Sequence, residues 1–208
     1  MFVKCIENGT WKENCYILCY LSNAIIIDPG ECYDEIIEFL SSKKLSPLAI
    51  LNTHAHFDHI ASVYEVQQKY CIPFYLHSND EKLLKSANAY MKLFGGTNFI
   101  KIPKVDYYLD DITDLKFCEI NLKVLFTPGH TNGSLCFLFN NILFTGDTLL
   151  KGKIGRVDLP GGNLTKLIQS LKQISKVKKN TYIYPGHGDP TVLKNELLFN
   201  KQLQYYIL

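Results

Sequence analysis

The chain has 208 residues, of which 47% are hydrophobic and 20% charged. These values are typical of an ordinary globular protein with one sizeable core. The net charge of +2 is too small to favour nucleic acid or an acidic membrane surface as a partner. No segment reaches the ~18 apolar residues of a membrane span, and the N-terminus lacks the features of a signal peptide. We therefore expect a cytoplasmic protein that binds neither nucleic acid nor membrane; the pattern does not predict its oligomeric state.

The first part of the chain predicts alternating strands and helices. Short apolar runs bounded by turns indicate strands, and apolar residues at helical spacing indicate helices. This alternation favours an α/β architecture. The expected strands are residues 2–7, 14–20, 24–28, 48–53 and 73–77, and the expected helices are 31–44, 59–70 and 79–86.

The segment 88–111 has no clear period. Gly95, Gly96 and Pro103 interrupt it, and several aromatic residues lie along it. A connection this long is usually functional or disordered, and the aromatic residues argue against disorder. Two interpretations remain open: a lip over an active site, and a loop that packs its aromatic side chains on the core.

The second part of the chain predicts strands followed by helices. An amphipathic helix is expected over 163–177, with Asn163 as its N-cap. The expected strands are 116–119, 122–127, 134–139, 142–145 and 181–184, and a final helix is expected from 191 to about 206.

The stretch Thr53–His59 concentrates potential metal ligands directly after a buried strand. His54, His56, Asp58 and His59 fall within six positions, and they include three of the six histidines of the chain. Imidazole nitrogen and carboxylate oxygen are ligands that a divalent ion such as zinc accepts. Residues two apart on an extended backbone point to one side, so His54 and His56 can share an ion.

Ionisable residues also follow tight turns at the ends of other apolar runs. Asp28, His130, Asp147 and His187 all lie at such positions. Because α/β sheets bind ligands at strand ends, we expect the last three to converge on the His54 motif. The remaining histidine, His77, is interpreted as structural.

The cysteines do not suggest a further metal site. The seven cysteines include no Cys-x-x-Cys pair, and most lie in apolar runs. We expect free buried thiols in a reducing compartment. A thiolate site built from Cys15 and Cys19 is the disfavoured alternative.

The complete pattern resembles the metallo-β-lactamase fold superfamily. The resemblance rests on His-x-His-x-Asp-His at 54–59, Pro-Gly-His at 128–130, Gly-Asp at 146–147 and Pro-Gly-His at 185–187. It implies a four-layer αββα sandwich over residues 1–208, a single domain of two similar halves, about 1–115 and 116–208.

The resemblance also implies the arrangement of the ligands. His54, His56 and His130 would bind one ion, Asp58, His59 and His187 a second, and Asp147 would bridge them. Asp28 would either shape the site or simply form a turn. We expect two divalent ions, zinc first, with iron or manganese as alternatives.

The segment 146–162 is most similar to small bacterial glyoxalase II-like hydrolases. Asp147 argues against a true β-lactamase, and His56 argues against a flavodiiron protein. We expect no counterpart of the C-terminal helical extension that helps to bind glutathione in full-length glyoxalase II. Arg156 or Lys153 is the candidate for substrate binding, with a structural salt bridge as the alternative role of Arg156.

We therefore expect hydrolysis of a hydroxyacyl-glutathione-type thioester, a small-molecule substrate. Two ions lower the pKa of a shared water, and Asp58 is the candidate catalytic residue that orients it. A mononuclear iron persulfide dioxygenase is the alternative, because that branch shares a Gly-Arg-x-Asp element like 155–158. Hydrolysis of a lactone or an ester, and a metal-binding regulatory module without activity, are further alternatives.

Overall fold

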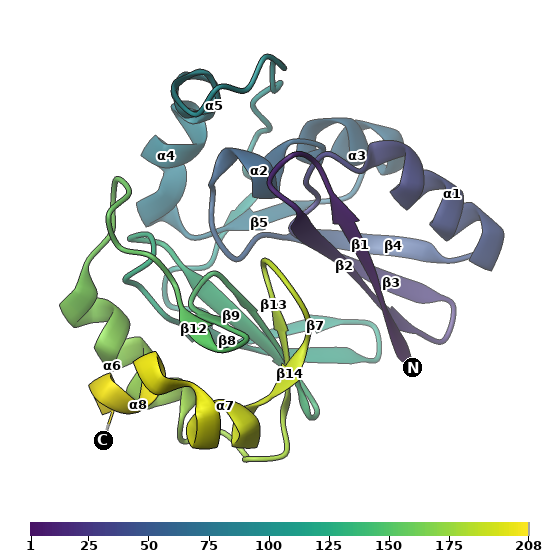
Figure 1. Ribbon diagram of the computed structural model, residues 1–208. Helices are drawn as coiled ribbons and strands as arrows, with labels where there is room; N and C mark the ends of the chain where they lie inside the picture. The colour runs from purple at the N-terminus through teal and green to yellow at the C-terminus, as the bar shows by residue number, and fades with distance from the viewer. Residues whose placement is uncertain (208) are drawn as a thin grey trace. The chain divides into compact units, whose positions relative to one another are not determined.

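The computed structural model describes residues 1–207, and the chain divides into two compact units (Figure 1). The N-terminal unit is Met1–Leu109 and the C-terminal unit is Asp110–Leu208. Each unit contains one six-stranded sheet, and each is described separately below.

The sheet of the N-terminal unit has the strand order β1-β2-β3-β4-β5-β6. The first three strands are antiparallel neighbours, and β3 to β6 are parallel. Parallel neighbours place their carboxyl ends at one edge of a sheet, where α/β proteins bind ligands. The strands are β1 (Phe2–Asn8), β2 (Glu13–Tyr20), β3 (Asn23–Ile27), β4 (Ser46–Leu51), β5 (Phe74–Leu76) and β6 (Tyr107–Tyr108).

Helices α1 and α3 bury their apolar sides on one face of this sheet. Ile36 of α1 and Val66 of α3 belong to the same buried cluster as Ile17, Ile26 and Ile50 of the strands. The helices of the unit are α1 (Tyr33–Lys43), α2 (Phe57–Ile60), α3 (Val63–Tyr70), the 3-10 helix η1 (Ser78–Asp80), α4 (Glu81–Lys85) and α5 (Ala87–Leu93).

Two expectations for the N-terminal unit need correction. The helix predicted over 59–70 is two helices, because Ser62 interrupts it: its N–H bonds to the carbonyl of Pro29 (3.0 Å), and its hydroxyl accepts from the N–H of Cys32 (3.3 Å). The segment 88–111 is not irregular throughout, because α5 and β6 lie at its two ends. Helix α3 ends at Cys71, a non-glycine residue with φ of 51°.

The sheet of the C-terminal unit has the order β14-β13-β10-β9-β8-β7. Strands β10 and β13 are parallel, and the other neighbours are antiparallel. Cys118, also at φ 51°, lies in the turn between β7 and β8. The strands are β7 (Asp114–Phe117), β8 (Ile120–Phe126), β9 (Leu135–Phe139), β10 (Ile142–Gly146), β13 (Tyr182–Pro185) and β14 (Thr191–Val192), with a separate hairpin of β11 (Leu149–Leu150) and β12 (Lys153–Ile154).

Three helices belong to the C-terminal unit: α6 (Leu164–Ile174), α7 (Leu193–Phe199) and α8 (Lys201–Ile207). Asn163 caps α6 as expected, because its side chain accepts from the N–H of Lys166 (2.9 Å). The single helix expected from 191 is wrong. Asn200 separates α7 from α8, and its side chain bonds to Glu196 (2.9 Å) and the N–H of Leu203 (3.0 Å). Among residues 1–207, no helix combines the length and apolarity needed to cross a membrane.

Candidate metal centre

The His54 motif leaves the sheet of the N-terminal unit beside Asp28. Strands β3 and β4 are parallel and end with Ile27 opposite Leu51. The N–H of Asp28 bonds to the carbonyl of Leu51 (3.1 Å), so the residues that follow both strands lie at the same edge. Asp28 adopts φ of 50°, which turns the chain sharply there.

Hydrogen bonds determine which ring nitrogen of His54 carries the proton and which keeps a lone pair for a metal ion. The hydroxyl of Thr53 donates its hydrogen to Asp28 (2.6 Å) and lies 3.0 Å from Nδ1 of His54. A hydroxyl has one hydrogen, so towards His54 it acts as the acceptor and Nδ1 carries the proton. The lone pair of neutral His54 therefore lies on Nε2.

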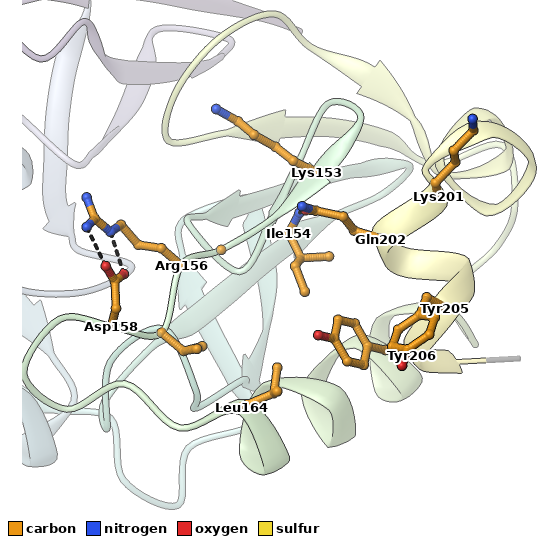
Figure 2. A pocket seen from close by; sticks show the side chains of 11 residues that line it. Lys153, Ile154, Arg156, Asp158, Leu164, Lys201, Gln202, Tyr205 and Tyr206 are labelled. Atoms are coloured by element: carbon orange, nitrogen blue, oxygen red, sulfur yellow. Dashed lines mark hydrogen bonds and ion pairs between the residues drawn. The ribbon is translucent and has the colours of Figure 1, made fainter.

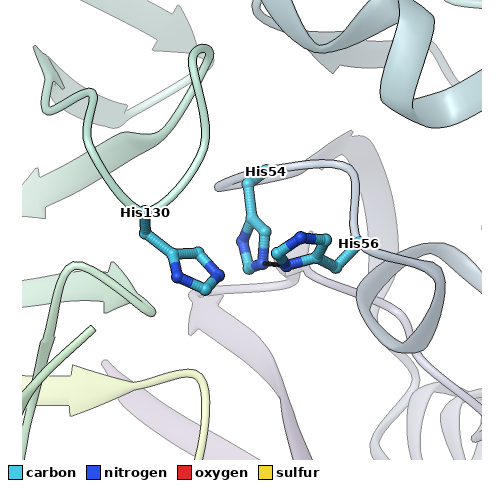
Figure 3. Close-up of side chains that lie close together, drawn as sticks. All are labelled: His54, His56 and His130. Carbon is cyan, nitrogen blue, oxygen red and sulfur yellow. Dashed lines mark hydrogen bonds between the residues drawn. The ribbon is translucent and has the colours of Figure 1, made fainter. Parts of the chain in front are cut away.

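His56 faces that lone pair. Its Nδ1 lies 3.0 Å from Nε2 of His54, and both side chains are buried (Figure 3). Two nitrogen ligands of one tetrahedral zinc ion lie about 3.3 Å apart, given Zn–N bonds of about 2.0 Å. The spacing of the two rings thus fits a shared ion.

Asp28 orients the ring of His59 as Thr53 orients that of His54, by a hydrogen bond to Nδ1. Its Oδ2 lies 3.1 Å from Nδ1 of His59, while its Oδ1 accepts from the backbone N–H of Thr53 (2.7 Å). A carboxylate only accepts, so Nδ1 of His59 donates and Nε2 keeps its lone pair. Although Asp28, His54 and His59 have ligand atoms within 4.8 Å of one another, the oxygens of Asp28 are engaged by these bonds. Asp28 is thus both the turn residue and the residue that shapes the site.

A second buried carboxyl, that of Glu13, also faces His59. Its Oε1 lies 3.6 Å from Nδ1 of His59, and the residue is 1% exposed. Burial, followed by the charge of Asp28, raises the pKa of Glu13 well above its usual range in the metal-free chain. A nearby divalent ion acts in the opposite direction, because it favours the charged form.

Other polar residues hold the motif in place. The amide of Asn52 donates to the carbonyl of His59 (2.7 Å), and the carboxylate of Asp80 accepts from the N–H of Ala55 (3.0 Å). Asp58 lies half-buried on α2 between His56 and His59. His77 is structural, as expected: its Nδ1 accepts from the N–H of Asn79 (3.1 Å) at the start of η1.

The C-terminal unit brings together the other three predicted ligands: Asp147 and His187 at the ends of β10 and β13, and His130 from the segment between β8 and β9. The N–H of Gly186 bonds to the carbonyl of Gly146 (2.8 Å), so Asp147 and His187 follow adjacent strand ends. Oδ2 of Asp147 lies 3.6 Å from Nε2 of His130 and 3.6 Å from Nε2 of His187. One carboxylate oxygen of Asp147 therefore lies equally close to the imidazoles of His130 and His187.

The orientation of His130 is also fixed by the backbone. Its Nδ1 lies 2.8 Å from the carbonyl oxygen of Arg156 and must donate to it, which leaves the lone pair on Nε2. The chain can approach this closely because residue 155 is glycine. A Cβ there would overlap the carbonyl oxygen of Asp147.

Arg156 and Lys153, the candidate substrate-binding residues, line an open pocket of about 560 Å³ (Figure 2). Lys201, Tyr205 and Tyr206 line it as well. The guanidinium of Arg156 forms two bonds of 2.7 Å with Asp158 and lowers the pKa of that carboxyl to about 2. The salt bridge considered for Arg156 is therefore present. Arg156, whose carbonyl oxygen accepts from His130, also lines the pocket.

The disfavoured alternative, a metal site built from the thiols of Cys15 and Cys19, is not supported. Cys15 and Cys19 are both buried in β2, and burial raises the pKa of each thiol, to about 11 for Cys19. Among residues 1–207, the groups of side chains whose ligand atoms lie close enough to share an ion contain no cysteine. The donors that fit a divalent ion are imidazole nitrogens and carboxylate oxygens, a set that suits zinc and iron.

The sequence is similar over most of its length to proteins of one known family. The sequence profile described as "Metallo-beta-lactamase superfamily" matches residues 8–187. The "Probable metallo-hydrolase YqgX" of Bacillus subtilis is 36% identical over 90% of each chain. "Hydroxyacylglutathione hydrolase GloC" of Haemophilus influenzae is 29% identical, over 94% of this chain and 95% of its own.

Two solved structures are similar over nearly the whole chain. The B3 metallo-β-lactamase BLEG-1 has a TM-score of 0.92 and 34% identity, covering 96% of this chain and 98% of its own. TTHA1623 in a di-iron-bound form has a TM-score of 0.86 and 32% identity, covering 95% and 98%. The expected fold class is therefore confirmed, and the chain belongs to the metallo-β-lactamase superfamily.

Proposed function

We propose that the chain is a dinuclear metal-dependent hydrolase. His54, His56 and His130 bind one ion, Asp58, His59 and His187 bind the second, and Asp147 bridges them. The observation that carries this proposal is the orientation of the histidines. Hydrogen bonds engage Nδ1 of His54, His59 and His130, so each presents the lone pair of Nε2.

The remaining chemistry is divided among residues of the chain. Two divalent ions in such a centre activate a water molecule and polarise a carbonyl oxygen. Asp58, half-buried on α2, accepts a hydrogen bond from that water and orients it. Asp147 brings one negative charge between the two ions, which lowers their mutual repulsion.

The proposed substrate is a thioester of the hydroxyacyl-glutathione type. The relative GloC, named as a hydroxyacylglutathione hydrolase, supports this substrate class. The pocket lined by Lys153 and Arg156 supports it too, because Lys153 supplies a positive charge, and Arg156 a second one once a carboxylate of the peptidic thiol replaces Asp158 as its partner. A thiolate leaves without a strong general acid, so this substrate class requires no further acid in the site.

A β-lactam is the second candidate substrate: the similarity to BLEG-1 favours it, whereas Asp147 argues against it. The metal is proposed to be zinc, and the di-iron form of TTHA1623 makes iron the second candidate. Iron also keeps open the persulfide dioxygenase alternative, which needs one iron per chain with room for oxygen.

One set of measurements separates these functions. Protein purified without added metal is analysed for metal identity and stoichiometry, then assayed with S-lactoylglutathione, a chromogenic cephalosporin and glutathione persulfide. We expect two ions per chain, release of thiol from the thioester without oxygen uptake, and loss of activity on chelation. One iron per chain with oxygen uptake on the persulfide and no thioester cleavage would overturn the proposal. Cleavage of the cephalosporin alone would replace the thioester as substrate.

A further inference from the structure

Nδ1 of His59 faces two buried carboxyl groups in the N-terminal unit. Oδ2 of Asp28 lies 3.1 Å away and Oε1 of Glu13 lies 3.6 Å away, and neither residue is more than 2% exposed. One N–H satisfies one close acceptor, and Asp28 has the shorter distance. Asp28 alone is therefore enough to orient the imidazole by a hydrogen bond. The presence of a second buried carboxyl, that of Glu13, beside the same nitrogen needs another explanation.

Glu13 is itself held firmly. It lies opposite Asn8 in the register of β1 and β2, and the amide of Asn8 donates to its Oε2 (2.7 Å). The same Asn8 accepts from the backbone N–H of Glu31 (2.6 Å), just after the Asp28 turn. Gly30 makes room for this arrangement, since a Cβ there would overlap both Oε2 of Glu13 and Oδ1 of Asn8.

A buried carboxyl is costly unless something nearby repays its desolvation. Asn8 bonds to one oxygen of Glu13, and the other oxygen is turned towards His59. At 3.6 Å the contact is too long for a hydrogen bond, so Glu13 acts on the imidazole through its charge and by limiting rotation of the ring. Both effects strengthen the bond between His59 and a cation on its far side.

We propose that Glu13 is a positioning residue for His59, which together with Asp28 tightens binding of the ion held by Asp58, His59 and His187. The proposal rests on the dinuclear centre proposed above. Glu13 favours binding of the second ion and has little effect on the ion held by His54, His56 and His130.

The test compares Glu13→Gln with wild type by zinc titration against a chromophoric chelator that resolves two dissociation constants. Glutamine keeps the shape and can still bond to Asn8, so the change removes the charge. We expect one dissociation constant, that of the ion at His59, to rise about tenfold, the lower limit for residues that support a metal ligand, and the other to stay within about twofold. The exposed Glu7→Gln on the same hairpin is the matched control and should change neither. Asn8→Ala, which releases Glu13, should reproduce part of the loss.

A second readout does not depend on the second ion. In metal-free protein, the ring N–H signal of His59 should shift or broaden in Glu13→Gln and not in Glu7→Gln, because an amide replaces the carboxyl group that faces the ring, whether or not that carboxyl is charged. Unchanged dissociation constants together with an unchanged ring signal overturn the inference. An equal loss at both ions with a lower melting temperature also overturns it, because Glu13 would then be merely structural. If wild type binds a single ion, the dinuclear proposal fails and the ring signal decides the role of Glu13.

Discussion

Oδ2 of Asp147 lies 3.6 Å from Nε2 of His187, across the ends of the parallel strands β10 and β13. The backbone bond between Gly186 and Gly146 holds the residues that follow, Asp147 and His187, at adjacent strand ends. The same oxygen is equally distant from His130. A carboxylate in this position can contribute to two coordination spheres.

Replacement of Asp147 should therefore remove metal from both sites. In Asp147→Ala we expect less than about a tenth of the wild-type metal content and at least 100-fold lower activity, since loss of the shared carboxylate exposes the two cations to mutual repulsion. Elemental analysis of the purified variant is the measurement. His77→Ala, which removes a histidine outside the centre, is the control and should keep its metal. Full metal content in Asp147→Ala would show that Asp147 does not bridge.

Asp28→Asn should weaken metal binding by misorienting His59. The amide nitrogen of asparagine cannot accept the Nδ1–H, and the bonds from Thr53 would be partly lost as well. We expect about 10- to 100-fold weaker binding of the ion at His59 and a loss of about 1–3 kcal/mol in the free energy of unfolding. Asp34→Asn, an exposed carboxylate on α1, is the matched control for chelator competition and urea unfolding. Equal metal affinity in the two variants would count against the role of Asp28.

Arg156→Ala tests whether the guanidinium recognises substrate or only braces its loop. If it binds the carboxylate of a peptidic thiol, we expect KM for the thioester to rise about tenfold with kcat changed less than about threefold. Asp158→Asn is the informative partner, because it releases Arg156 without removing it and should lower KM or leave it unchanged. Similar losses of kcat in both variants would assign the pair to loop structure.

The pH dependence of the Arg156–Asp158 pair follows from its carboxyl. Since the folded pKa of Asp158 is lowered to about 2, the pair is intact above the ordinary carboxyl pKa and is lost only as pH falls towards 2. We therefore expect the KM ratio between Arg156→Ala and wild type to be constant from about pH 5 to 8. A ratio that changes across this range in steady-state kinetics would mean that another group controls Arg156.

The N-cap of α6 offers a test of stability away from the centre. Asn163→Ala removes the acceptor for the N–H of Lys166 and should cost about 1 kcal/mol in the free energy of unfolding. Asn163→Asp keeps an acceptor and should retain most of the stability in the same denaturant titration. Equal destabilisation by both substitutions would mean that packing, not capping, explains the effect.

The residues that could be predicted from sequence are those whose spacing or position carries the signal. His54 and His56 follow a buried strand two residues apart, and His130 and His187 follow Pro-Gly turns at strand ends. Asn163 could be predicted because a polar residue directly precedes an apolar stripe.

The supporting residues could not be predicted, because their partners are remote in sequence. Asp80 binds the N–H of Ala55 across 25 positions, and Glu13, the first residue of β2, lies 46 positions before His59. No local pattern marks such pairs, since only the folded sheet brings them together. The break at Asn200 is similar: its amide also bonds to the carbonyl of Lys153, 47 positions earlier.

Cys71 and Cys118 each combine a thiol that air can oxidise with a left-handed backbone conformation. Both thiols are exposed, so oxidation can join chains through intermolecular disulfides during storage. Both residues also hold a backbone conformation that costs an L side chain about 1–2 kcal/mol and glycine almost nothing. Glycine at these two positions would therefore remove the cross-linking thiols while relieving local strain, which suits a preparation intended for metal analysis without added reductant.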